Sequence, residues 1–117
     1  MEFRTEEITI DGDLVKVKIP TSVNIKPTVY HELDAPKVIY YNLPDSLREK
    51  YQYMDIENII HYHYNYLDVM AHSIMADDEP NFEYLAKKLE PVELSVEDMR
   101  VIFDVERYYL KLIKVIF

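Results

Sequence analysis

The chain has 117 residues, the size of one ordinary domain (residues 1–117), and its apolar content of 49% favours a folded protein over a disordered one. Asp and Glu number 22 against 13 Lys and Arg, so the formal charge of -9 repels nucleic-acid backbones and membrane surfaces and favours a protein partner. The absence of cysteine excludes disulfides and thiolate chemistry and favours a cytoplasmic or nuclear location, while the single glycine, Gly12, excludes glycine-rich phosphate loops.

The first predicted element is a β-hairpin centred on Asp11-Gly12, a dipeptide that supplies the positive φ angles of a type I′ turn. Apolar residues alternate with polar ones on both sides of this turn: Ile8, Ile10, Val15, Val17 and Ile19. Residues 21–36 leave room for a short helix around 28–33 at most. The run of β-branched and aromatic residues at 37–43 then predicts a third strand, buried on both faces or at the centre of the sheet, which Pro44 ends.

Helical periodicity fills the second half of the chain. A capping box at Ser46 and Glu49 predicts a short helix, and Asp55 is predicted to cap a longer one behind it. The longer helix is expected to bury one stripe: Ile56, Ile59, Ile60, His63, Leu67, Met70, Ala71 and Ile74. Pro80 is predicted to open a third helix, and Ser95 the last one. Strands followed by helices predict an α+β fold, in which a small, mainly antiparallel sheet of hairpin and third strand packs against three to four helices.

The last predicted helix, residues 95–117, has one narrow polar stripe: Glu97, Arg100, Asp104, Arg107, Lys111 and Lys114. The rest of its surface is apolar and forms two ridges. A helix of this kind must bury its apolar surface within its domain or against another molecule. Because one ridge suffices to seal a core of this size, we expect part of the other to bind a protein partner or a second copy of the chain.

Tyrosines on the middle helix extend this predicted interface. Tyr62 and Tyr66 lie one helical turn apart, away from the buried stripe, and tyrosine is enriched at interface hot spots. Packing inside the chain's own domain is an equally good interpretation of these rings. The predicted partner-binding set is Tyr62, Tyr66, Tyr109, Leu110, Ile113, Ile116 and Phe117.

The middle helix also carries two pairs of a carboxylate and a histidine, Glu57 with His61 and Asp68 with His72, each one turn apart. Such pairs can bind a metal ion or position a proton donor. Zinc sites, however, use three or four converging ligands, and a solvated helix face explains the pairs more simply. We therefore expect no metal and no cofactor.

Glu106 is the charged residue that lies off the polar stripe of the last helix. A buried carboxylate at this position would have a raised pKa and would be a candidate general acid or base. The alternatives are a place at the edge of the stripe or an ion pair with a partner's Arg or Lys. The acidic segment Asp77, Asp78 and Glu79 lacks the ligand spacing and the central glycine of an EF-hand loop, so a solvated loop is predicted there.

Three segments carry a resemblance to the SKP1/elongin C family. The segment "ITIDGDLVKVKI" is similar to the family's opening hairpin, "ENIIHYHYNYLD" to one of its helices, and "EPNFEYL" with "VIFDVERYYLKLIKVI" to its acidic loop and last BTB helix. The resemblance implies a BTB/POZ fold and an adaptor role in cullin-type ubiquitin ligases. Two departures from the family are Val105, Glu106 and Arg107, where the family has small residues, and extra residues between Leu43 and Asp55. The chain also ends where SKP1 adds its F-box-binding helices, so the resemblance implies an elongin C-like core without F-box binding.

Three functions follow from these patterns. The first is a non-enzymatic interaction or adaptor subunit that binds a partner through the last helix. The second is a small acidic inhibitor, viral or from a mobile element, that occupies the basic nucleic-acid-binding groove of a target protein. The third is a metal-dependent enzyme built on the histidine and carboxylate pairs. Affinity that falls steeply with salt distinguishes the acidic inhibitor from an apolar adaptor.

Overall fold

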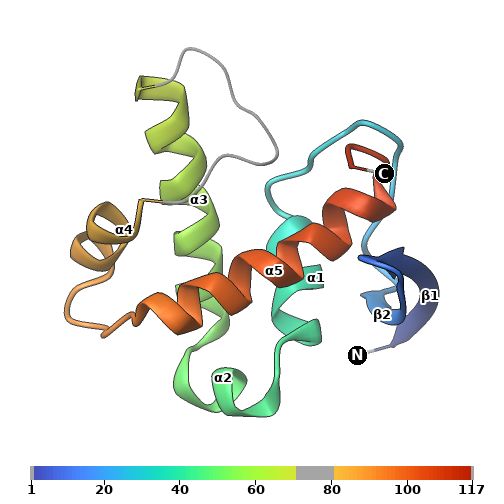
Figure 1. The fold of residues 1–117 in the computed structure, drawn as a ribbon, viewed down its shortest axis with the longest axis horizontal. Coiled ribbons are helices and arrows are strands. Elements are labelled where there is room, and N and C mark those ends of the chain that lie inside the picture. The colour runs from blue at the N-terminus through green and yellow to red at the C-terminus, as the bar shows by residue number, and fades with distance from the viewer. Residues whose placement is uncertain (1, 71–80, 117) are drawn as a thin grey trace.

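A computed structural model describes residues 2–70 and 81–116 of the chain, without the side chains of residues 66–70. Two antiparallel strands, β1 (Phe3–Ile10) and β2 (Asp13–Pro20), come first, and helices follow. The helices are α1 (Ala35–Asn42), α2 (Asp45–Lys50), α3 (Tyr53–Met70), α4 (Phe82–Leu89) and α5 (Val96–Leu112). The chain therefore has the small α+β fold that the sequence predicts (Figure 1). None of the described helices is both long and apolar enough to cross a membrane.

The predicted hairpin is confirmed. Asp11 and Gly12 have φ angles of 51° and 85°, as a type I′ turn requires, and Ile10 pairs with Asp13 across the turn. Alternation then directs one face of the sheet inward, where Val17 and Ile19 are fully buried. The single glycine of the chain thus lies at a position where positive φ is needed.

The predicted third strand is wrong, because residues 35–42 form helix α1. Pro36 lies in the first turn, where proline is tolerated, and Leu43 ends the helix in an extended conformation. Val38 packs in the cluster under the hairpin, and Ile39 packs in a second cluster with α2 and α3. The segment is buried on two sides, as expected of a central strand, but a short apolar run does not distinguish a buried strand from a buried helix.

The last residue of α1 closes the free edge of β2. The side-chain amide of Asn42 donates to the carbonyl oxygen of Lys18 at 2.8 Å, and its Oδ1 accepts from the Lys18 N–H at 2.9 Å. The same amide also donates to the Val38 carbonyl at 2.7 Å. Asn42 therefore pairs with the strand as a neighbouring backbone would, and it fixes the hairpin to the helices.

We expect Asn42→Ala to lower the free energy of unfolding by about 1 to 2 kcal/mol, because three hydrogen bonds are lost at a partly exposed site. Urea unfolding followed by far-UV circular dichroism measures the change. Asn24→Ala, in the exposed segment after β2, is the control and should change this free energy by no more than about 0.5 kcal/mol. Equal effects of the two substitutions would contradict the role of Asn42.

Helices α2, α3 and α4 begin close to their predicted positions, with different caps. The capping box at Ser46 and Glu49 is wrong, since α2 begins at Asp45 behind Pro44 and has no side-chain cap. Asp55 lies inside the first turn of α3 and accepts from the Gln52 N–H at 2.9 Å. The N-cap of α4 is Asn81, while Pro80 lies outside the described residues. Residues 28–33 form turns without a helix.

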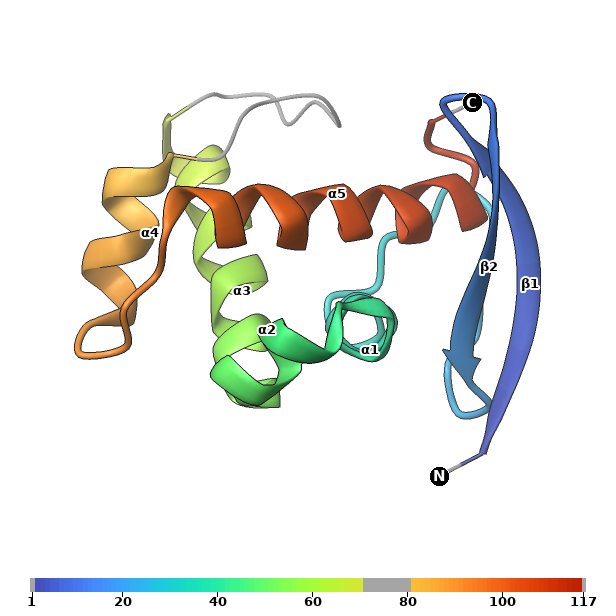
Figure 2. The ribbon, with the colours of Figure 1, turned by 60° about the horizontal axis from the view of Figure 1, so that its bottom comes forward.

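Helix α5 crosses the whole molecule. Figure 2 shows α3 and α4 at the N-terminal end of α5 and the hairpin at its C-terminal end, with α1 beneath it. Its first half packs in a cluster with α2, α3 and α4, and its second half packs in the cluster under the hairpin. Because one helix serves two clusters, both of its apolar ridges are needed to build the core.

The predicted end of the last helix is corrected from residue 117 to Leu112. Lys114 takes a positive φ of 62°, and the Val115 N–H donates to the Leu110 carbonyl at 3.0 Å. This pattern is a Schellman motif, which ends a helix. The Thr28 N–H donates to the carbonyl of Ile113, so the segment after β2 is attached to this helix end.

Candidate functional site

A pocket opens between α3 and the segment that precedes α1. Its volume is about 260 Å³, and its lining residues are Glu32, Leu33, Glu57, Asn58, Ile60, His61 and Tyr64. Two of them, Glu57 and His61, are residues that the helix pattern singles out. The structure adds Glu32 and Leu33, which come from the turns before α1 and which no sequence signal connects with α3.

The pocket combines apolar walls with uncompensated negative charge. Of its apolar lining residues, Ile60 is buried and Leu33 is 62% exposed. Neither Glu32 nor Glu57 forms an ion pair with any side chain in the part of the chain that the structure describes. His61 is exposed, and its Nε2 lies 3.0 Å from the side-chain nitrogen of Asn65. The pocket thus offers two carboxylates and apolar contact to a ligand.

Tyr64 connects the pocket with a buried carboxylate. The hydroxyl of Tyr64 donates to Glu106 Oε2 at 3.0 Å, and the hydroxyl of Tyr30 donates to the same oxygen at 2.9 Å. Glu106 is 4% exposed. Burial raises the pKa of Glu106 to about 7, although the two hydrogen bonds favour its charged form. Of the three interpretations of Glu106, a place at the exposed edge of the polar stripe is therefore wrong, because the side chain is buried.

The partner-binding residues predicted on the last helix are mostly inside the protein. Tyr109, Leu110 and Ile113 are 0%, 3% and 0% exposed, because the hairpin and α1 cover this end of α5. The Tyr109 hydroxyl accepts a hydrogen bond from the His31 N–H at 3.1 Å. Ile116 is half-buried against the same cluster. The prediction that these three buried side chains meet a partner is therefore corrected: in this fold they are core residues.

Tyr62 of α3 is half-buried against the cluster that contains α4 and the first half of α5. The Nζ of Lys88 lies 5.9 Å from the ring centroid of Tyr62 and 5.7 Å from that of Tyr84, so the ammonium group bridges two aromatic faces. This arrangement joins α4 to α3. Other predicted sites lie outside the described residues: the side chains of Tyr66 and Asp68, then His72, the acidic segment 77–79, and Phe117.

No group of three or more His, Cys, Asp or Glu side chains that could hold a metal ion occurs among the described residues. Glu57 and His61 lie together in the pocket, as their spacing predicts. Their predicted companions, the side chain of Asp68 and His72, are outside the described part of the chain.

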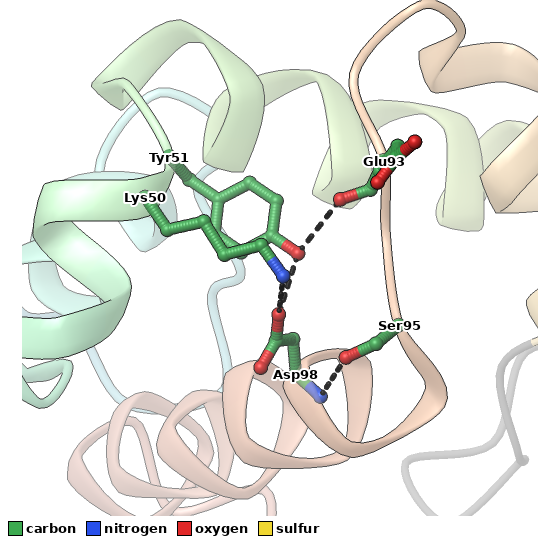
Figure 3. Close-up of polar contacts among 5 residues, drawn as sticks. All are labelled: Lys50, Tyr51, Glu93, Ser95 and Asp98. Atoms are coloured by element: carbon green, nitrogen blue, oxygen red, sulfur yellow. Dashed lines mark hydrogen bonds and ion pairs between the residues drawn. The ribbon is translucent and has the colours of Figure 1, made fainter.

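A second polar cluster lies at the start of α5 (Figure 3). As predicted, Ser95 caps this helix, since its hydroxyl accepts from the Asp98 N–H at 3.1 Å. The Oδ2 of Asp98 accepts from the Tyr51 hydroxyl and from Lys50 Nζ, each at 2.7 Å, and the Tyr51 hydroxyl also lies 3.1 Å from the Glu93 carbonyl oxygen. Burial opposes the charge on Asp98, but hydrogen bonds from its neighbours hold its pKa below the ordinary value. These groups satisfy one another and fasten the end of α2 to α5.

Comparison of the chain with protein-family models, curated protein sequences and solved structures finds no match. The resemblance to the SKP1/elongin C family stays a prediction.

Proposed function

We propose that the chain is a non-enzymatic, acidic protein-binding module that holds a basic side chain of its partner in the pocket beside α3. The observation that carries this proposal is the pair of carboxylates, Glu32 and Glu57, at a pocket with apolar walls. Neither carboxylate forms an ion pair within the described residues. A cation from outside is the group that best complements such a site.

The size of the pocket favours an anchor point over a substrate site. Small-molecule sites typically enclose about 300 to 1,000 Å³, whereas this pocket has about 260 Å³. It is large enough for one long side chain of a partner. Interfaces are commonly anchored by a side chain that fills such a pocket, surrounded by contacts that exclude water.

Arginine suits the pocket better than lysine. A guanidinium group can donate to two carboxylates at once and can also stack on an aromatic ring, which Tyr64 supplies. The methylene groups of its side chain would contact Leu33 and Ile60. Lysine presents a compact, strongly hydrated charge and would gain less from the same surroundings.

The net charge supports a basic partner in general. A chain with a formal charge of -9 attracts positively charged surfaces and accelerates their association at low salt. Attraction to a basic surface is common to two of the functions considered: an adaptor that has a basic target, and an acidic inhibitor that occupies a basic groove. Both differ from an adaptor that inserts its last helix into a partner, because the side chains needed for that mode are core residues.

Titration of the protein with N-acetyl-arginine amide tests the pocket, with amide chemical shifts as the measurement. We expect shifts concentrated at Leu33, at Asn58 and at the neighbouring turn of α3, and weaker binding of N-acetyl-lysine amide. In the double variant Glu32→Gln/Glu57→Gln, affinity should fall by about tenfold or more, because charge-assisted hydrogen bonds are lost.

The matched control is Glu49→Gln/Glu83→Gln, which removes the same charge from exposed sites on α2 and α4. This control should keep the affinity of the unmodified protein. Shifts spread evenly over the acidic surface, or equal losses in the two double variants, would show that net charge alone attracts the ligand and would refute the pocket.

A further inference from the structure

The outer edge of β1 is open. Lys18 pairs with Thr5 in the hairpin register, yet the N–H and C=O groups of Lys18 bond to Asn42 on the other side of β2. Thr5 and Lys18 are therefore a pair that does not exchange hydrogen bonds, so the backbone groups of Thr5 point away from β2. By the same alternation, those of Phe3, Glu7 and Thr9 also point outward.

The two edges of the sheet differ in whether their outward backbone groups are hydrogen-bonded. Asn42 occupies the edge of β2, whereas none of the described residues donates to or accepts from the outward backbone groups of β1. The side chains of Thr5, Glu7 and Thr9 are exposed. A strand edge in this condition is a template on which an extended peptide can add a strand.

Charge on β1 argues against a second copy of the chain as the added strand. Antiparallel pairing of two β1 strands about Glu6 or about Glu7 would place like carboxylates opposite each other, which destabilises a sheet. Each chain also carries a formal charge of -9. Edge strands that carry such charges resist pairing with themselves.

The strand that β1 already binds shows which sequence suits it. In β2, Lys16 lies opposite Glu7, and Val17 and Val15 lie opposite Glu6 and Ile8. A strand on the open side of β1 would meet the same side chains that β2 meets: Glu7 between Thr5 and Thr9 on one face, and Glu6 and Ile8 on the other. A strand that places a basic side chain opposite Glu7, with β-branched residues before and after it, repeats the pairing that β2 makes at this point.

We propose that the open edge of β1 binds an extended segment of a partner protein in which Lys or Arg alternates with β-branched residues, and that this segment forms a third strand of the sheet. Main-chain hydrogen bonds to Phe3, Thr5, Glu7 and Thr9 provide the affinity, and Glu7 selects a basic side chain. This surface is separate from the pocket, since α1 lies between α3 and the hairpin in both ribbon views (Figures 1 and 2).

The test uses a fluorescein-labelled peptide, acetyl-Thr-Val-Lys-Val-Lys-Val-Thr-amide, and fluorescence anisotropy with the full chain. We expect binding, together with slower hydrogen exchange at the amides of Thr5 and Glu7. In Thr5→Pro, the peptide should bind more weakly by about tenfold or more, because an outward N–H is lost while the ladder to β2 keeps its bonds. A peptide with Glu in place of both lysines should bind poorly.

Charge-reversal variants keep the test valid if Thr5→Pro does not fold. Glu7→Lys should weaken binding, whereas Glu49→Lys, with the same change in net charge on α2, should not. Equal losses in these two variants, or unchanged binding by a folded Thr5→Pro, would overturn the proposal. A dimer of the unmodified chain in light scattering that Thr5→Pro converts to a monomer would identify a second copy as the occupant and would also overturn it. The pocket variant Glu32→Gln/Glu57→Gln should bind the strand peptide normally, so the two proposals can fail separately.

Discussion

Between about pH 5 and about pH 8, the unmodified protein is expected to lose about 2 to 3 kcal/mol of stability through the titration of Glu106, and Glu106→Gln should remove this loss. Burial raises the pKa of Glu106 from 4.5 to about 7 in the folded protein. The folded state therefore binds this proton more tightly than the unfolded state does. The resulting stabilisation is complete at low pH and is lost as the pH rises through about 7.

A substitute for Glu106 must still accept the hydrogen bonds that this side chain accepts in the folded protein. Tyr30 and Tyr64 both donate to one carboxyl oxygen, and the side-chain carbonyl of Gln can accept from them without a charge. The variant therefore keeps an acceptor for both phenols and removes the titration. Relative to the unmodified protein, Glu106→Gln should gain stability steadily as the pH increases from about 5 to about 8.

Urea unfolding at several pH values, followed by far-UV circular dichroism, measures this difference. Asp104→Asn is the control, because Asp104 is an exposed carboxylate on the same helix. Its effect on stability should change little over the same pH range. Parallel pH profiles for Glu106→Gln and the unmodified protein would show that the folded protein does not hold the proton on Glu106.

Replacing Ile113 with Ala is expected to lower the free energy of unfolding by about 2 to 5 kcal/mol. Ile113 is fully buried in the cluster under the hairpin, so the truncation leaves a cavity and removes contacts with the strands and α1. A chain of this length has a total stability of roughly 6 to 18 kcal/mol. The substitution therefore costs a large share of the stability.

The control for this prediction is Val115→Ala, two residues further along. Val115 is 39% exposed, and its truncation should cost less than about 1 kcal/mol. Similar, small effects of the two substitutions in urea unfolding would indicate that Ile113 is not a core residue. The side chain would then be available to a partner, as the sequence pattern first suggests.

Signals that act over a few residues are enough to predict several elements. Asp11-Gly12 predicts the hairpin because a type I′ turn needs positive φ at both central residues, and glycine, asparagine and aspartate accept it most readily. Ser95 predicts the start of α5 because its hydroxyl satisfies a free backbone N–H. The buried stripe of α3 follows from spacing alone, and Ile56, Ile59 and Ile60 are all buried. In each case the cause lies within one or two turns of chain.

The wrong prediction of a strand at residues 37–43 arises because the structure of this segment depends on distant contacts. Val38 and Ile39 are β-branched and lie in an apolar run, which favours a strand. Their burial against two different clusters depends on the hairpin and on α2 and α3, which are distant in the sequence or follow later. A helix with Asn42 at its end also closes the edge of β2, which a local pattern cannot indicate.

The pocket and the buried carboxylate show the same limit. The sequence marks Glu106 as lying off the polar stripe and Glu57 as lying one turn from His61. It does not indicate that Tyr30, 76 positions from Glu106 in sequence, donates to that carboxylate, or that Glu32 lies beside the same face of α3. These contacts depend on how the segment before α1 crosses the helices.

By itself, the sequence determined that this protein is a small acidic α+β chain, with a glycine-turn hairpin and a last helix too apolar to be exposed. Periodicity and turn chemistry are local, so they specify elements and the faces that must be buried. Only the tertiary structure decided what covers those faces. The hairpin and α1 cover the end of α5, so both proposals for a partner rest on other surfaces, namely the carboxylates beside α3 and the open edge of β1.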